Sequence, residues 1–143
     1  MKYMPKKPMR AIQLRWKEPL GRDECPYMYR WVLNLGLFSV RLHKWIRSDD
    51  KRFYHDHPWP FITIVLRGSY TDVSPDGEDT LKAGSMRLRS SLHRHYVKVP
   101  PEGALTLLVT GPKMRNWGFW IKEKFKRPFK YFHTYGHPPC DDQ

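Results

Sequence analysis

The chain has 143 residues and a formal net charge of +12 at pH 7, from 26 Lys and Arg against 14 Asp and Glu. With 40% hydrophobic and 15% aromatic residues it can build a core, which excludes wholesale disorder. No apolar run approaches the ~20 residues of a membrane helix. The length fits one compact domain. The charge is compatible with a nucleic-acid partner, an anionic ligand or a charged surface.

Two cysteines, Cys25 and Cys140, lie near opposite ends of the chain and form no C-x-x-C unit. The sequence therefore predicts neither a disulfide framework nor a cysteine-rich zinc site, with a single Cys25–Cys140 bridge as the alternative. Residues 1–10 are basic and have no apolar stretch behind them, which argues against a secretory signal. A reducing cytoplasm is the expected location.

The first 29 residues resemble an arm more than a part of a sheet. They mix lysine and arginine with four prolines, at positions 5, 8, 19 and 26. We expect an irregular, basic lead-in over 1–29, a folded unit over 30–122, and a basic, aromatic C-terminal extension over 123–143.

Short β-rich runs follow one another from residue 30 onward. They cover 31–33, 37–43, 61–66, 70–73, 85–89, 93–99, 104–110 and 117–122. Gly68 is expected to end the apolar run 61–66, and turn residues occupy 74–77 and 100–103. Many short strands at this spacing, without a long amphipathic helix, predict an all-β sandwich or barrel.

His55-Asp56-His57 is the most informative stretch of the sequence. In a strand, residues i and i+2 point to the same face, so two imidazoles could converge on one divalent ion. A third ligand would come from a neighbouring strand. His93 is the best candidate, and His43 and His95 are the alternatives.

The order of these motifs resembles the cupin superfamily, and within it a subgroup of small phage and bacterial cupin-like proteins. The resemblance rests on His55-Asp56-His57-Pro58-Trp59-Pro60-Phe61, on Leu66-Arg67-Gly68-Ser69-Tyr70, on Arg89 with His93-Arg94, and on Gly111-Pro112 through Arg115-Asn116-Trp117-Gly118-Phe119. It implies a single-domain antiparallel jelly-roll β-barrel over about residues 30–121. It also implies one divalent metal ion (Fe, Zn, Ni or Mn) on His55, His57 and His93.

The sequence departs from the cupin pattern at two places. Phe61 or Ile62 stands where the family has a glutamate ligand, and Ser90-Ser91 replaces a Pro-x-Gly turn. Three neutral histidines without a carboxylate leave the charge of the ion uncompensated, which favours an anionic ligand.

Candidate anion-binding residues lie on the strands that would surround this site. They are Arg41, His43, Arg89, Arg94, His95 and Tyr70. On the strand at 37–43, either Arg41, His43 and Trp45 point into the barrel, or Val40, Leu42 and Ile46 do; the alternation leaves both open. A third basic group, at 122–130, carries aromatic residues between its lysines, as nucleic-acid-binding segments do.

Together these features predict a metal-binding cupin-like protein that acts on or binds a small anionic molecule. Oxygenase, isomerase and hydrolase chemistry all stay open, because the fold hosts many reactions. The alternative is a non-catalytic binding module, or a nucleic-acid-associated or phage accessory protein that uses its basic surface. The resemblance also implies a homodimer, and no membrane partner is expected.

Overall fold

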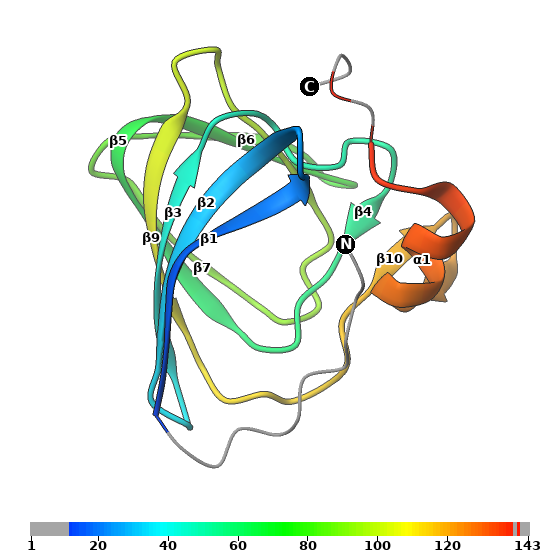
Figure 1. Ribbon diagram of the computed structural model, residues 1–143, viewed down its shortest axis with the longest axis horizontal. Helices are drawn as coiled ribbons and strands as arrows, with labels where there is room; N and C mark the ends of the chain where they lie inside the picture. Colours follow the sequence, from blue (N-terminus) through cyan, green and yellow to red (C-terminus); the bar gives the residue numbers. More distant parts are fainter. Residues whose placement is uncertain (1–11, 139, 141–143) are drawn as a thin grey trace.

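Eleven strands and one short helix make up the described part of the chain (Figure 1). The computed structural model describes residues 12–138 and 140. The strands are β1 (Gln13–Arg22), β2 (Cys25–Asn34), β3 (Ser39–Trp45), β4 (Tyr54–His55), β5 (Phe61–Ser74), β6 (Gly77–Lys82), β7 (Met86–Arg89), β8 (Tyr96–Lys98), β9 (Ala104–Thr110), β10 (Phe119–Ile121) and β11 (Lys124–Lys126). The helix is α1 (Pro128–Tyr135), and no helix in the described range is long and apolar enough to cross a membrane.

The strands form two antiparallel sheets. In the larger, the order is β1-β2-β3-β9-β5-β6, and β7 and β8 also pair with β5; the smaller has the order β11-β10-β4. The first residues of β5 pair with β7 and β9 and its last residues with β6 and β8, so this strand joins two walls of the barrel. The predicted all-β, antiparallel jelly-roll architecture is confirmed.

The prediction that Gly68 ends a strand was wrong, because β5 runs through it. Gly68 has a φ of +77° next to a register shift between Val65 and Arg67, where the strand bends. A Cβ at Gly68 would lie 2.5 Å from the Gly103 carbonyl oxygen. Only glycine combines this backbone conformation with so close an approach, and it therefore lets the strand continue around the bend.

The prediction of an irregular arm was also wrong within the described residues, because β1 and β2 form a hairpin from residue 13 onward. Its inner face carries charge, including an Arg30–Glu18 ion pair at 2.6 Å, which hides the usual strand pattern. Pro19 lies on β1, at the edge of the sheet, where a missing N–H costs no ladder bond. The expected arm over residues 1–11 lies outside the described residues.

The polar face of β3, not its apolar face, points into the barrel. Ser39, His43 and Trp45 are buried and Lys44 is exposed, so the odd-numbered residues point into the barrel. Neighbouring strands add the buried hydroxyls of Thr63, Thr106 and Thr110 to the same interior. An apolar cluster closes the barrel beyond this polar zone; it comprises Met28, Trp45, Val65, Tyr70, Leu81, Val97 and Ala104.

Cys25 and Cys140 form a disulfide, with Cα atoms 6.0 Å apart. The C-terminal segment reaches Cys25 because Arg22 donates hydrogen bonds to the carbonyl oxygens of His137 (2.9 Å) and Pro138 (3.0 Å). This bridge is the single Cys25–Cys140 pairing that the sequence left open as the alternative to free cysteines. The bridge gives no support to the expected cytoplasmic location.

Candidate metal centre

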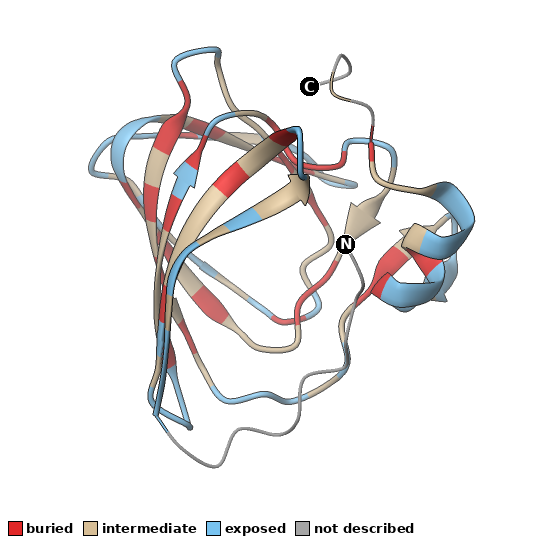
Figure 2. Cartoon of the chain, in the orientation of Figure 1, coloured by how far each residue is buried: buried red, intermediate tan, exposed pale blue. Residues whose placement is uncertain are grey.

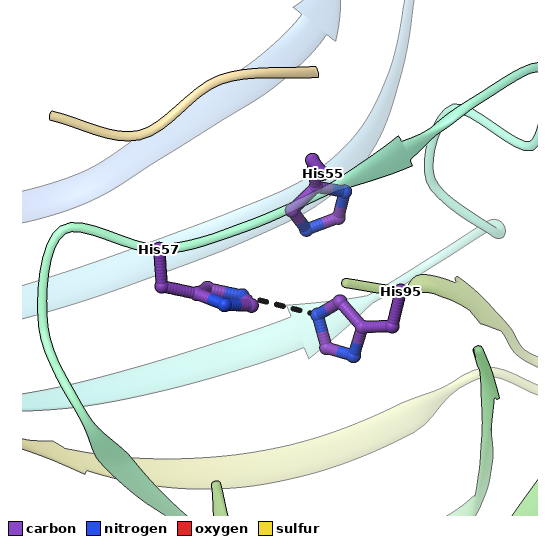
Figure 3. A group of neighbouring side chains, drawn as sticks. All are labelled: His55, His57 and His95. Atoms are coloured by element: carbon purple, nitrogen blue, oxygen red, sulfur yellow. Dashed lines mark hydrogen bonds between the residues drawn. The ribbon is translucent and has the colours of Figure 1, made fainter. Parts of the chain in front are cut away.

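Three histidine rings meet where β4 runs beside the start of β8 (Figure 3). His55 lies in β4, His57 follows it, and His95 immediately precedes β8. The backbones of His55 and His95 exchange two N–H···O=C bonds, at 2.9 and 3.0 Å. The ring centroids are 4.7, 4.8 and 5.3 Å apart, and one ligand atom from each ring lies within 4.8 Å of the others. The sequence thus folds three nitrogen donors into one small volume.

Burial favours the neutral form of all three rings. Burial lowers the pKa of His55 and of His57 well below the ordinary value, and their histidine neighbours add to the effect. Burial also lowers the pKa of His95, although the adjacent Asp72 carboxylate opposes it. A neutral imidazole keeps a lone pair on one ring nitrogen, which is the form that binds a metal ion.

The predicted third ligand, His93, is not the histidine that joins the pair. His93 lies in the turn before β8, where its N–H bonds to the Ser90 carbonyl oxygen, and its Nε2 bonds to Asp72. His95 stands directly opposite His55 in the ladder and brings its Nε2 to 3.1 Å from His57 Nε2. The histidine set that the structure brings together is His55, His57 and His95.

Asp72 on β5 orients this set, although the sequence reasoning did not single it out. Its side chain is 2% exposed and accepts hydrogen bonds from His95 Nδ1 at 2.7 Å and from His93 Nε2 at 2.9 Å. Burial alone would raise the pKa of Asp72, but the two histidine hydrogen bonds hold it well below the usual range. Since Nδ1 of His95 donates to Asp72, Nε2 carries the lone pair that faces His57. The signal in the sequence is an aspartate inside an otherwise apolar strand, because a buried charge needs partners.

We expect Asp72→Asn to weaken divalent-metal binding by about 10–100-fold, as for carboxylates that orient ligating histidines in other proteins. The amide can present its N–H₂ to His95 Nδ1 and so favour the wrong tautomer. Competition against a fluorescent zinc chelator would measure the affinity. Asp79→Asn is the matched control, since Asp79 pairs with Arg87 and Arg89 but contacts none of the three histidines. Equal affinities for the two variants would show that Asp72 does not orient the site.

The donor set fits a divalent transition metal. Neutral imidazoles suit Zn, Cu, Fe and Ni, and the Asp72 hydrogen bond is the usual companion of a ligating histidine. Phe61, at the position where the family has its glutamate, packs its ring on His57, with centroids 4.4 Å apart. A further carboxyl group, that of Asp49, lies 3.9 Å from His55 Nε2, and burial raises its pKa well above the ordinary value.

Asp56 lies between the first two histidines and points to the other face. It accepts hydrogen bonds from the Gly118 N–H (2.8 Å) and from Trp120 Nε1 (2.9 Å), and it pairs with Arg115 at 2.6 Å. These contacts tie the His-x-His segment to β10 and so hold His55 and His57 in place.

The predicted anion-binding residues fall into three places. Arg41 and His43 lie on the face of β3 that points into the barrel, which is one of the two alternatives that the sequence left open. Arg89 is occupied by Asp72 (3.4 Å) and Asp79 (2.8 Å) and so supports the site from outside. Tyr70 belongs to the apolar cluster, where burial raises its pKa well above the ordinary value.

Arg94 does not face the histidines. Because neighbouring residues of a strand alternate, His95 points inward and Arg94 and Tyr96 point outward. The Arg94 guanidinium lies over the Trp120 ring, 3.5 Å from its centroid. Arg94 and Trp120 line a groove of about 430 Å³, together with Tyr54, Tyr96 and Lys122.

No protein-family model and no curated protein sequence matches this chain. Among solved structures it is similar to the Fe(II) form of HppE, with a TM-score of 0.56 and 13% identity over 76% of this chain and 60% of that one. It is also similar to KdgF from Halomonas sp. (TM-score 0.54, 15% identity, 66% and 88% coverage). A third similar structure is oxalate decarboxylase from Bacillus subtilis, with a TM-score of 0.51 and 17% identity over 73% of this chain and 28% of that one. At this identity the similarities show the fold alone: the chain shares the antiparallel jelly-roll fold of these proteins.

Proposed function

We propose that the chain binds one divalent metal ion through His55, His57 and His95, and a small anionic molecule in the polar barrel interior next to it. The cupin fold and the buried three-histidine group support the metal site. The anionic ligand is supported by a separate feature of the interior, its unsatisfied polar atoms.

Buried polar groups without partners are the observation that carries this proposal. Within residues 12–138 and 140, both ring nitrogens of His43 and the Thr63 hydroxyl are buried and lack a hydrogen-bond partner. Such groups are rare in folded proteins because each costs about 1–3 kcal/mol. A ligand with several oxygen atoms would satisfy them.

The charge of the interior favours an anion. Arg41 lies on the same face of β3 as His43, and burial together with Arg30 and Arg15 lowers its pKa to about 9, so it is still protonated at neutral pH. The Glu18 carboxylate, whose charge acts in the opposite direction on the pKa of Arg41, is already paired with Arg15 and Arg30. Arg41 therefore keeps a positive charge for a ligand, with its guanidinium 4.8 Å from the Trp59 ring centroid.

Each of these residues would have a different role in binding the ligand. Arg41 would pair with the anionic group, as guanidinium does with carboxylate or phosphate. Neutral His43 would donate to the ligand from one ring nitrogen and accept from it at the other. Phe61 and Trp59, whose rings pack on His57, would exclude water from that side. A divalent ion on the histidines would supply Lewis acidity or a site for dioxygen. Oxygenase and isomerase chemistry both fit this arrangement.

Calorimetric titration of the Mn(II)-loaded protein with oxalate and with inorganic phosphate tests the anion site. We expect Arg41→Gln to weaken the tighter probe by about 10–100-fold, the usual value of a hydrogen bond to a charged group. Arg94→Gln, which removes an arginine from the outer groove, should leave the affinity unchanged. Failure of both probes to bind, or equal affinity in wild type and Arg41→Gln, would contradict an anion site at Arg41.

A second candidate is a nucleic-acid-associated function, favoured by the groove around Arg94. The groove joins Arg94 and Lys122 to the aromatic rings of Tyr54, Tyr96 and Trp120, a combination that suits phosphates and stacked bases. If it binds nucleic acid, affinity for a single-stranded oligothymidylate will fall steeply with salt and will drop in Trp120→Ala. Absence of binding at low salt would remove this candidate.

A further inference from the structure

His95 has a partner at each of its ring nitrogens, and only one of these partners belongs to the three-histidine group. Its Nε2 faces His57 at 3.1 Å, whereas its Nδ1 is directed away from His57 and lies 2.7 Å from Asp72 (Figure 3). His93 brings its Nε2 to the same carboxylate, 2.9 and 3.0 Å from the two oxygen atoms. One ligand atom from each of Asp72, His93 and His95 therefore lies within 4.8 Å of the others.

Asp72 has more donors than the orientation of His95 requires. One hydrogen bond fixes the His95 tautomer, and Arg89, whose Nε lies 3.4 Å from the carboxylate, already balances its negative charge. The His93 ring is a further nitrogen donor at the same carboxylate. The turn that carries this ring is held by a hydrogen bond from the His93 N–H to the Ser90 carbonyl oxygen, at 3.1 Å. His93 is thus placed as a ligand would be.

The spacing of these atoms suits a metal ion in place of the shared protons. A divalent ion holds nitrogen and oxygen ligands at about 2.0–2.2 Å, which keeps neighbouring ligand atoms roughly 3 Å apart. The nitrogen-to-oxygen distances around Asp72 are 2.7, 2.9 and 3.0 Å, so small shifts are enough to admit an ion. Strand β4 beside the group is intermediate in burial (Figure 2), and the His93 side chain is 20% exposed, so the group is open to solvent.

We propose that Asp72, His93 and His95 form a second metal position, and that His95 bridges the two ions as an imidazolate. The proposal rests on the three-histidine metal site and extends it. Binding of the second ion releases the Nδ1 proton of His95 to solvent, and each nitrogen of that ring then donates a lone pair to one ion. His93 binds through Nε2 with its proton on Nδ1. Cu(II) is the ion expected here, because it forms the most stable complexes of the first-row divalent metals.

The second ion binds after the first and more weakly. The positive charges of the first ion and of Arg89 both oppose it, and Asp79 offsets only part of the Arg89 charge by pairing with it at 2.8 Å. Protein that has been loaded with metal and desalted therefore keeps one ion, at His55, His57 and His95. The second position fills only in the presence of excess copper.

Titration of the full chain with Cu(II), followed by electron paramagnetic resonance at low temperature, tests the proposal. The first equivalent should give a signal of about one unpaired spin per chain, and the second should reduce it by about half or more. The reason is that an imidazolate bridge couples the two copper spins antiferromagnetically. Loading the first site with Zn(II) before adding one equivalent of Cu(II) should restore the signal of a single copper ion, with hyperfine splitting from nitrogen ligands.

His93→Ala separates the second position from the metal site on which it rests. This variant should bind the first equivalent as the wild type does and should lose no signal on addition of the second. His133→Ala removes an exposed histidine of α1 that contacts neither group, and it should behave like the wild type. Thermal unfolding of both variants checks that they fold.

Two results would overturn the second position and leave the first intact. One is a wild-type signal that doubles with the second equivalent of Cu(II). The other is a loss of signal that persists in folded His93→Ala. Failure of the wild type to bind even the first equivalent would instead contradict the three-histidine site, and the bridged pair with it.

Discussion

Replacing His95 by alanine is expected to reduce bound divalent metal from about one ion per chain to a small residual fraction. The reason is geometric: His95 Nε2 faces His57 Nε2 at 3.1 Å, and removing one of three nitrogen donors leaves a pair that cannot hold the ion tightly. Elemental analysis after reconstitution with Zn(II) or Mn(II) and desalting measures the effect. The His55→Ala/His57→Ala double variant should give the same loss.

His93→Ala is the matched control, because His93 is the neighbouring histidine and shares the Asp72 carboxylate without joining the three rings. It should retain close to the wild-type amount of metal. Full loss in His93→Ala with retention in His95→Ala would reverse the assignment and restore the ligand set expected from the sequence. A wild-type protein that takes up no metal would contradict the site as a whole.

Removing the disulfide is expected to lower the free energy of unfolding by up to about 5 kcal/mol. The bridge joins residues separated by 115 positions, and closing so long a loop removes much entropy from the unfolded chain. It also holds the C-terminal segment, where Arg47 donates to the Cys140 carbonyl oxygen at 3.3 Å. Guanidinium unfolding of wild type and of Cys25→Ala/Cys140→Ala gives the difference.

Wild type treated with a reductant should unfold at the same denaturant concentration as the double variant, since both lack the cross-link. The double variant itself should not respond to the reductant. A difference below about 1 kcal/mol between wild type and variant would show that the bridge adds little to stability.

The central strands could be predicted from the sequence because their burial follows a simple pattern. Phe61–Val65 and Ala104–Thr110 carry apolar residues on both faces, and both became strands. The β1–β2 hairpin could not be predicted in this way. Its inner face is charged and its outer face apolar, so the local pattern resembles a polar arm until the neighbouring strands are known.

The site was predictable in part for a related reason. His55 and His57 lie two residues apart, so their meeting on one face follows from strand geometry. The choice between His93 and His95 depends on which residue pairs with His55, and that register is set by β5 and β4 together. Asp72 comes from a third segment, 17 positions after His55 in the numbering, and no local motif joins it to the histidines.

The bend of β5 at Gly68 has a consequence for ligand choice. Before the bend the strand supplies Phe61 and Thr63 to the barrel interior, and after it the strand supplies Asp72, which orients His95. One continuous backbone thus sets the separation between the polar interior and the histidine group, because strand residues advance by about 3.3 Å each. A molecule that reaches both Arg41 and the histidines must match that separation. Under the proposed function, the barrel would select its ligand by length as well as by charge.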